Sequence, residues 1–170
     1  MQVRIAGIEE ESYVDGEGIR FTIFVQGCPH HCIGCHNPQT FDFDGGRSID
    51  IESLLERIKS NPLLDGVTFS GGEPLCQLKP LLPLARAIKE MHLTLWCYTG
   101  FTFEELIDGA EGFFTAEEIR EFLQYVDVLV DGPFVEKQRD LSLTFRGSFN
   151  QRLIDIPNTL AEKKIIRAEF

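Results

Sequence analysis

Residues 19–35 read IRFTIFVQGCPHHCIGC: an apolar run with a regular period, followed at once by three cysteines. The apolar side chains that share one face of an extended chain here are Ile19, Phe21, Ile23 and Val25. This period of two predicts a strand over 19–26. The loop that follows, 27–47, is rich in Gly, Pro, His and Asn, and loops of this length inside a compact domain are usually functional. The stretch therefore predicts a strand that ends in a chemically active loop.

The three cysteines, Cys28, Cys32 and Cys35, have the spacing C-x3-C-x2-C. Thiolates select zinc, Cu(I) or iron–sulfur clusters, and an ordinary cubane is held by four cysteines, so this set is one ligand short. In one interpretation the cysteines bind three irons of a 4Fe-4S cluster, and the fourth iron is open to a chelating substrate. In another, a histidine completes a Cys3His zinc site. A third interpretation gives the cysteines a purely structural role. The histidines available to zinc are His30, His31 and His36.

Composition narrows these choices. A chain of 170 residues with 43% hydrophobic residues buries about 70% of its unfolded surface, so it does not need structural zinc to fold. A net charge of −11 argues against broad nucleic-acid binding. No apolar run is long enough to span a membrane and no secretory signal is visible, so we expect a cytoplasmic protein. Five cysteines, an odd count with three clustered, favour metal ligation over disulfides.

The rest of the chain predicts one α/β domain, residues 1–170. After residue 50, helical and extended patterns alternate, which is typical of a parallel sheet with right-handed crossovers. Helices are expected to begin near Asp50, Pro80, Phe103 and Thr115, where Glu118 completes a capping box. A further helix is expected in the C-terminal tail, 158–170. The other expected strands are 3–8, 66–70, 93–98, 126–130 and 153–156.

Four expected strands end in loops with polar or small residues, namely Cys28, Gly71–Glu73, Tyr98–Gly100 and Asp131–Gly132. Ligands of parallel α/β folds gather at the carboxyl ends of strands, so we expect these loops to meet at one edge of the sheet. Each loop also has a purely structural interpretation. A Gly-Gly-Glu-Pro sequence forms a tight turn, and polar residues are common at strand ends.

Taken together, the C-x3-C-x2-C loop and the Gly-Gly-Glu-Pro turn resemble the radical S-adenosylmethionine (radical SAM) superfamily. Within it, residues 15–20 (DGEGIR) and 35–38 (CHNP) resemble the glycyl-radical-enzyme activases. Residues 98–101 (YTGF), 127–134 (DVLVDGPF) and 145–152 (FRGSFNQR) are similar to those activases whose target is an anaerobic ribonucleoside-triphosphate reductase. The resemblance extends over most of the chain.

This resemblance implies an incomplete, TIM-like (β/α) barrel with mostly parallel strands. It implies a 4Fe-4S cluster on Cys28, Cys32 and Cys35, with S-adenosyl-L-methionine on the open iron. Reductive cleavage then gives a 5′-deoxyadenosyl radical, which takes hydrogen from a glycine of the large reductase subunit and leaves a glycyl radical there. Pyruvate formate-lyase is the alternative target. The implied electron donor is a small flavodoxin-like or ferredoxin-like protein.

The resemblance also implies roles for residues around the cluster. Gly71, Gly72 and Glu73 meet the methionine amino group, and Gly34 and His36 lie where the adenine binds. Many superfamily members have an aromatic residue before the third cysteine. Since this chain has glycine there, His36 is the expected substitute. Weaker candidates for contacts with the ribose or the methionine are Tyr98, Thr99, Asp131, Asn150 and Arg152.

Overall fold

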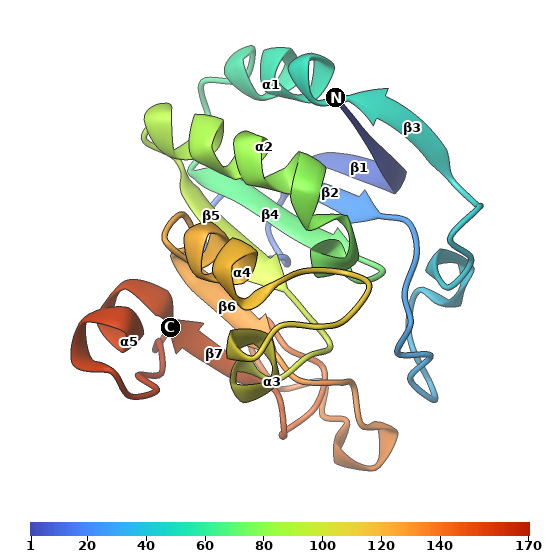
Figure 1. Cartoon of the computed structure of the whole chain (residues 1–170), viewed down its shortest axis with the longest axis vertical. Coiled ribbons are helices and arrows are strands. Elements are labelled where there is room, and N and C mark those ends of the chain that lie inside the picture. Colours follow the sequence, from blue (N-terminus) through green and yellow to red (C-terminus); the bar gives the residue numbers. More distant parts are fainter.

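The computed structural model describes residues 1–170, and an open seven-stranded sheet forms its centre (Figure 1). The strand order is β3-β1-β2-β4-β5-β6-β7. The four central strands β2, β4, β5 and β6 are parallel, whereas β1, β3 and β7 pair antiparallel at the two sides. The α/β class with a parallel centre is confirmed. The strands are β1 (Gln2–Ser12), β2 (Arg20–Val25), β3 (Arg47–Asp50), β4 (Gly66–Gly71), β5 (Thr94–Tyr98), β6 (Val128–Asp131) and β7 (Arg152–Asp155).

Three of the helices, α1, α2 and α4, lie side by side on one face of the sheet (Figure 1). The capping box predicted from Thr115 and Glu118 is present at the start of α4, and Thr102 with Glu105 forms a second one at α3. The helices are α1 (Ile51–Lys59), α2 (Leu78–Glu90), α3 (Phe103–Ile107), α4 (Ala116–Leu123) and α5 (Ile156–Glu162); short 3-10 turns are η1 (Pro38–Thr40), η2 (Pro74–Gln77) and η3 (Glu136–Gln138).

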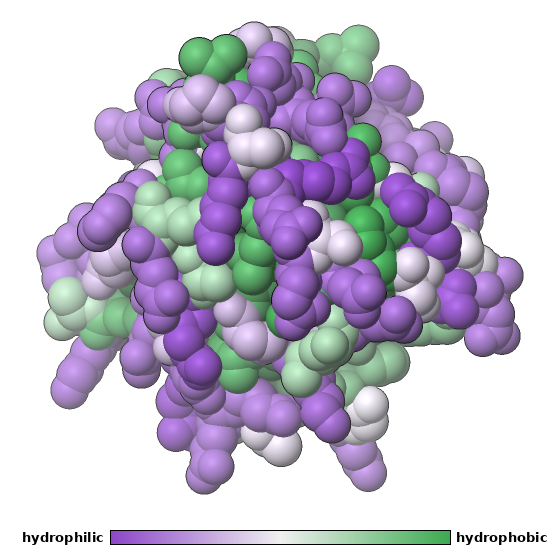
Figure 2. Space-filling view, turned by 90° about the horizontal axis from the view of Figure 1, so that it is seen from above, coloured by the Kyte–Doolittle hydropathy of each residue, from purple (hydrophilic) through white to green (hydrophobic).

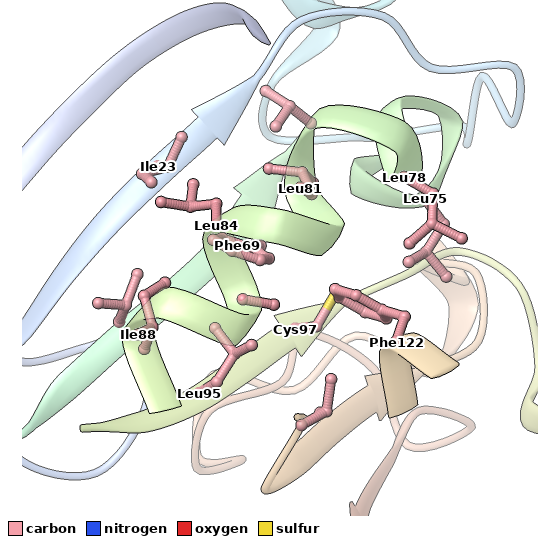
Figure 3. Close-up of a cluster of buried hydrophobic side chains, with 14 of the residues drawn as sticks. Ile23, Phe69, Leu75, Leu78, Leu81, Leu84, Ile88, Leu95, Cys97 and Phe122 are labelled. Carbon is pink, nitrogen blue, oxygen red and sulfur yellow. The ribbon is translucent and has the colours of Figure 1, made fainter. Parts of the chain in front are cut away.

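The main core lies between these helices and the sheet. Alternate residues of the central strands point towards α2 and α4, as the period of two requires (Figure 3). Phe69 of β4 and Cys97 of β5 are fully buried there, against Leu84 of α2 and Phe122 of α4. Cys97 is thus a small core residue.

The opposite face of the sheet carries a buried arginine. The Arg20 guanidinium donates from Nε to Thr68 Oγ1 at 2.7 Å and from Nη1 to the Glu17 carbonyl at 2.9 Å, and it lies 5.4 Å from the centre of the Trp96 ring. Burial lowers its pKa to about 10, which leaves it cationic at neutral pH. Arg20 therefore holds the turn before β2 against this face of the sheet, which is the face opposite α2.

Two predictions about the ends of elements are wrong. The tail helix does not extend over 158–170: α5 ends at Glu162 because Lys163 adopts a left-handed conformation, with φ of 56°. The chain then returns along β7, where the Asp155 amide donates to the Ile166 carbonyl at 2.8 Å. In addition, the loop expected over 27–47 contains η1 and gives way to edge strand β3 at its last residue.

The surface seen from above in Figure 2 is mostly hydrophilic, with small apolar areas between polar side chains. No helix in the structure has both the length and the apolar character needed to cross a bilayer.

Loss of a core side chain of α2 should leave a costly cavity between this helix and the sheet. Because Leu84 is fully buried, Leu84→Ala should lower the free energy of unfolding by about 2–5 kcal/mol. Urea denaturation of the metal-free protein measures the loss. Leu63, which is 62% exposed, supplies the control, and Leu63→Ala should cost less than about 0.5 kcal/mol. Equal losses in the two variants would contradict this assignment of the core.

Candidate functional site

The loops at the ends of the four parallel strands meet at one pocket, as the sequence predicts. Strand pairing brings the ends level, since Val25 pairs with Gly71 and Tyr98 with Val130. All three clustered cysteines open onto this pocket. Its lining residues are Cys28, His30, Cys32, Cys35, His36, Asn37, Thr40 and Phe41 after β2; Ser70, Gly71 and Gly72 at β4; Tyr98, Thr99 and Gly100 at β5; and Gly132, Phe134, Gly147 and Gln151 beyond β6.

The three cysteines of the pocket are free thiols in two environments. Cys28 is buried, whereas Cys32 and Cys35 are partly exposed. The Cys35 amide donates to the Cys32 carbonyl at 3.1 Å, which folds the two residues into a turn. Burial raises the pKa of Cys28 to about 11, so the metal-free thiol is protonated at neutral pH. Metal binding must therefore displace this proton.

The donor set has the chemistry of an iron–sulfur site. In a cluster each cysteine binds a different iron. Here three soft thiols line one pocket. The residues present thus fit an iron–sulfur cluster.

The cysteine loop is held in place by amide side chains that sequence reasoning missed. Gln26 Nε2 donates to the carbonyls of Gln39 and Asp42, at 2.9 and 2.6 Å. Gln77 Nε2 in turn donates to the carbonyls of Gln26, at 3.0 Å, and of Arg4, at 2.7 Å. These bonds tie the second half of the loop to Gln26 at its start, and Gln26 in turn to Gln77 of η2, which also binds Arg4 of β1. The loop therefore has a framework that does not depend on metal.

Gly34 and His36 lie on either side of Cys35, but only His36 lines the pocket. Gly34 has a φ of 78°, and a Cβ atom there would lie 3.0 Å from the carboxyl carbon of Glu136. The positive φ therefore disfavours an aromatic residue at this position, whereas the Glu136 carboxyl group is the end of an exposed, flexible side chain that can move. The His36 ring lies 5.3 Å from that of Phe134, and Phe41 and Tyr98 are the other aromatic side chains that line the pocket.

Gly71 and Gly72 expose their backbone to the pocket, and packing also requires them to be glycine. A Cβ on Gly71 would lie 2.5 Å from the amide nitrogen of Val25, and one on Gly72 would lie 2.4 Å from the carbonyl oxygen of Gly27. The end of β4 thus touches the end of β2 along the backbone. Both interpretations of the Gly-Gly turn, structural and ligand-binding, are compatible with this geometry.

Glu73 is fully buried and lies behind the pocket lining. Its carboxylate accepts from the Leu75 amide at 3.1 Å, from Thr99 Oγ1 at 2.9 Å and from the Gly100 amide at 2.8 Å. His30 Nε2 completes the set at 2.7 Å. The sequence indicates His30 only as a possible zinc ligand. In the structure, its hydrogen bond to Glu73 joins the cysteine loop to the ends of β4 and β5.

The weaker candidates divide into two groups. Tyr98 and Thr99 line the pocket, and the Tyr98 hydroxyl donates to the Phe145 carbonyl at 2.7 Å. Burial raises the pKa of Tyr98, so its phenol is neutral. Asn150 lies outside the pocket lining, where its Nδ2 donates to the carbonyl of Pro133 at 2.7 Å.

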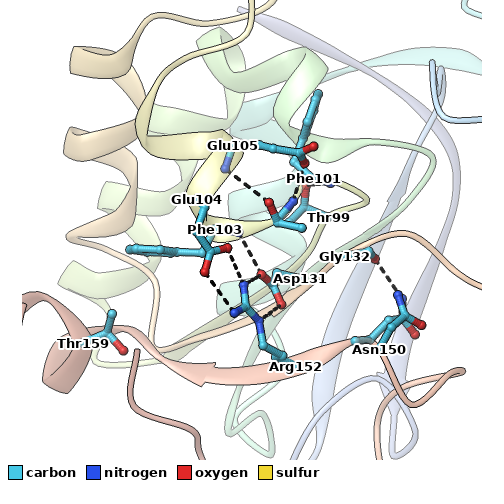
Figure 4. Close-up of polar contacts among 12 residues, drawn as sticks. Thr99, Phe101, Phe103, Glu104, Glu105, Asp131, Gly132, Asn150, Arg152 and Thr159 are labelled. Atoms are coloured by element: carbon cyan, nitrogen blue, oxygen red, sulfur yellow. Dashed lines mark hydrogen bonds and ion pairs between the residues drawn. The ribbon is translucent and has the colours of Figure 1, made fainter. Parts of the chain in front are cut away.

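Asp131 and Arg152 also lie outside the pocket lining, in an ion-pair network (Figure 4). Asp131 is buried and accepts from Arg152 and from the Phe103 amide. Arg152 reaches Glu104 as well, at 2.7 Å, and this hydrogen bond lowers the Glu104 pKa. The network therefore connects the end of β6 to β7 and α3.

Fold and pocket together define an α/β domain with three free thiols in one pocket at the strand ends. In agreement, a family model described as "4Fe-4S single cluster domain" matches residues 14–154. The anaerobic ribonucleoside-triphosphate reductase-activating protein of Haemophilus influenzae is 38% identical, over 81% of this chain and 88% of that protein. The protein of the same name from Enterobacteria phage T4 is 32% identical, over 83% and 86%.

Two further matches are shorter or more distant. The pyruvate formate-lyase-activating enzyme of Clostridium pasteurianum is 44% identical over 92 residues, which are 51% of this chain and 39% of that one. The crystal structure of QueE from Escherichia coli superposes with a TM-score of 0.49 at 18% identity, over 77% of this chain and 70% of that one. On the full-length matches, the chain belongs to the family of anaerobic ribonucleoside-triphosphate reductase-activating proteins.

The contacts of Glu73 predict a large effect on stability. Removal of its carboxylate leaves the buried donors of Thr99 and Gly100 without a partner, so Glu73→Ala should cost about 3–5 kcal/mol in the free energy of unfolding. Urea denaturation of the metal-free protein tests this without any cofactor. Glu111, which is exposed and makes no salt bridge, is the control. If Glu73→Ala were as mild as Glu111→Ala, Glu73 would not join the strand ends.

Proposed function

We propose that this chain activates an anaerobic ribonucleoside-triphosphate reductase by radical SAM chemistry. When bound, the 4Fe-4S cluster and S-adenosyl-L-methionine supply a reductive cleavage whose 5′-deoxyadenosyl radical takes hydrogen from a glycine of the large reductase subunit, leaving a glycyl radical. The observation that carries the proposal is the meeting of three cysteines and a Gly-Gly backbone in one pocket, at the ends of neighbouring parallel strands. Membership of the activating-protein family supports the choice of target.

In this proposal Cys28, Cys32 and Cys35 hold the cluster and leave one iron free for the substrate. The backbone of Gly71 and Gly72 meets the methionine amino group. The buried Glu73 carboxylate behind these glycines adds negative charge that favours a cationic amine. Its existing hydrogen bonds give it a second task, which is to keep the strand ends at fixed positions.

The adenosyl end is assigned to the aromatic side of the pocket. His36, which lies beside Phe134, contacts the adenine, and Gly34 leaves space for Glu136. Tyr98 and Thr99 contact the ribose or the methionine. Asp131 contributes from outside the pocket, because its pairing with Arg152 fixes the end of β6.

The architecture is consistent with this chemistry. We interpret the open sheet, with helices on one face and the pocket at the carboxyl ends of its parallel strands, as the incomplete (β/α) barrel of the superfamily. The cytoplasm is the expected compartment, because thiol ligands stay reduced there.

The alternative target is pyruvate formate-lyase, which the match to the Clostridium pasteurianum enzyme favours. That match covers only 39% of its length, whereas the reductase activators match over 86–88% of theirs. The proposed reductase should therefore acquire the glycyl radical signal in electron paramagnetic resonance, and a purified pyruvate formate-lyase should not. The reverse result would replace the target while leaving the chemistry intact.

The cluster assignment predicts a clear loss in a single variant. After anaerobic reconstitution the protein should be brown, carry about four irons per chain and release 5′-deoxyadenosine only when reductant is present. Cys32→Ala should release none, although its far-ultraviolet circular dichroism should be unchanged because the core does not involve Cys32. Cys76→Ala is the matched control, since this thiol lies outside the pocket lining, and it should keep both iron and product. A colourless wild-type protein with tightly bound zinc would refute the proposal.

A further inference from the structure

The chain after β6 packs against the outer side of the cysteine loop. The Glu136 side chain contacts Gly34, and the Phe134 ring lies against that of His36. Beyond η3 the chain turns back on itself, so that the Phe149 amide donates to the Gln138 carbonyl at 3.0 Å. An isolated bridge between Arg139 and Ser148 continues this pairing. We call residues 134–149 the basic hairpin, for the charges described next.

The basic hairpin is a local exception to the charge of the protein. Residues 21–41 contain no Asp, Glu, Lys or Arg, so the cysteine loop has no formal charge up to that point. The hairpin brings three cations beside it, none of which forms a salt bridge: Lys137, Arg139 and Arg146. The basic hairpin also contains two carboxylates, Glu136 and Asp140. The hairpin is therefore net positive in a chain of charge −11.

Apolar side chains lie exposed among these cations. Ile33 in the cysteine loop is 80% exposed, and Leu141 and Phe149 in the hairpin are 85% and 57% exposed. Ile33 precedes Gly34, which the hairpin touches through Glu136. Exposed apolar groups flanked by charges are typical of sites for transient protein contacts.

We propose that Ile33, Lys137, Arg139 and Phe149 form the docking surface for an acidic one-electron carrier protein, and this rests on the function proposed above. The carrier, a flavoprotein or an iron–sulfur protein, is oxidised by one electron, and the metal centre held by Cys28, Cys32 and Cys35 is reduced by one. Since Ile33 and Cys35 are two residues apart, a protein seated here reaches the metal centre by a short path.

Charge explains why the partner is acidic and why it binds at this surface. An acidic carrier is repelled by most of a chain of charge −11. Because charges are screened beyond about 8 Å at physiological ionic strength, local cations decide its orientation on approach. Lys137 and Arg139 are exposed and unpaired at the required place, and charges of this kind raise association rates more than affinity.

The carrier and the reductase are expected to bind at different places on the protein. The glycine of the reductase must reach the inside of the pocket, where the carbon radical forms. None of the four docking residues lines that pocket. Phe134 and Gly147 of the basic hairpin do line the pocket, but the four docking residues are exposed outside it, so the two proteins can approach the metal centre from different sides.

The test compares two reductants on the reconstituted, cluster-loaded protein. A reduced acidic flavodoxin is the protein donor, and photoreduced 5-deazariboflavin is the small neutral one. In Lys137→Glu/Arg139→Glu, the bimolecular rate of cluster reduction by flavodoxin at low salt should fall about tenfold or more, while reduction by deazaflavin should be unchanged. The wild-type rate with flavodoxin should also fall as salt is added, and the variant rate should depend less on salt.

Lys79→Glu/Lys163→Glu is the matched control, since it makes the same change in net charge at exposed positions outside the pocket and the hairpin. This control should keep more than half of the wild-type rate with flavodoxin. An equal loss in both double variants would overturn the proposal, because net charge alone would then be responsible. A loss with deazaflavin as well, repeated in the neutral variant Lys137→Gln/Arg139→Gln, would also overturn it, since the hairpin would then shape the metal site itself.

A third result would overturn the docking proposal in favour of the reductase. In that case Lys137→Glu/Arg139→Glu accepts electrons normally from both donors but no longer installs the glycyl radical. Failure of the proposed function is recognised separately, because the wild-type protein would then release no 5′-deoxyadenosine with either reductant.

Discussion

The site depends on the buried carboxylate of Glu73. A buried charge is costly unless hydrogen bonds replace its lost hydration, and here the donors come from three different strand ends. Thr99 and Gly100 approach from β5, Leu75 from the turn after β4, and His30 from the cysteine loop. Because one carboxylate satisfies them all, no loop can move without leaving a buried polar group unpaired. The pocket is therefore shaped by the protein before any cofactor binds.

The cysteine loop is also held in position before any cofactor binds, in this case by amide side chains. Gln26 and Gln77 hold its two ends through backbone carbonyls, so that the thiols are the part of the loop left free for metal. This division suits a site whose ligands must accept a cofactor after folding. Cys28 is buried with a raised pKa, so the metal must displace its proton, whereas the hydrogen-bonded frame can stay unchanged.

The features that depend on local patterns could be predicted from the sequence. Alternation of apolar residues predicted the central strands, and Thr115 with Glu118 predicted the start of α4. The meeting of strand ends followed from the general geometry of parallel sheets. What sequence reasoning missed depends on contacts between distant segments. Edge strand β3 is short and mostly exposed, with little apolar pattern, and Lys163 ends α5 in a conformation that usually signals glycine.

Contacts between distant segments also explain why the positions of two site residues could not be predicted from the sequence. Glu73 and Asp131 both follow strands in the sequence, yet each is turned away from the pocket by a partner far along the chain, His30 or Arg152. Such partners cannot be recognised from spacing, because their side chains meet only in the folded sheet. Gly34 is the counterexample, since the missing aromatic residue was visible in the sequence, although the positive φ that favours glycine there was not.

Glu136 lies between the cysteine loop and the basic hairpin. By filling the space beside Gly34, it joins the cysteine loop to the basic hairpin, and so places a positive, partly apolar surface directly behind Cys35. The pocket opens on the other side of that cysteine, between His36 and the glycines of β4. In the proposed mechanism the cluster is bordered by two surfaces of different chemistry. An electron and a hydrogen atom then enter by separate routes, and neither partner has to leave before the other binds.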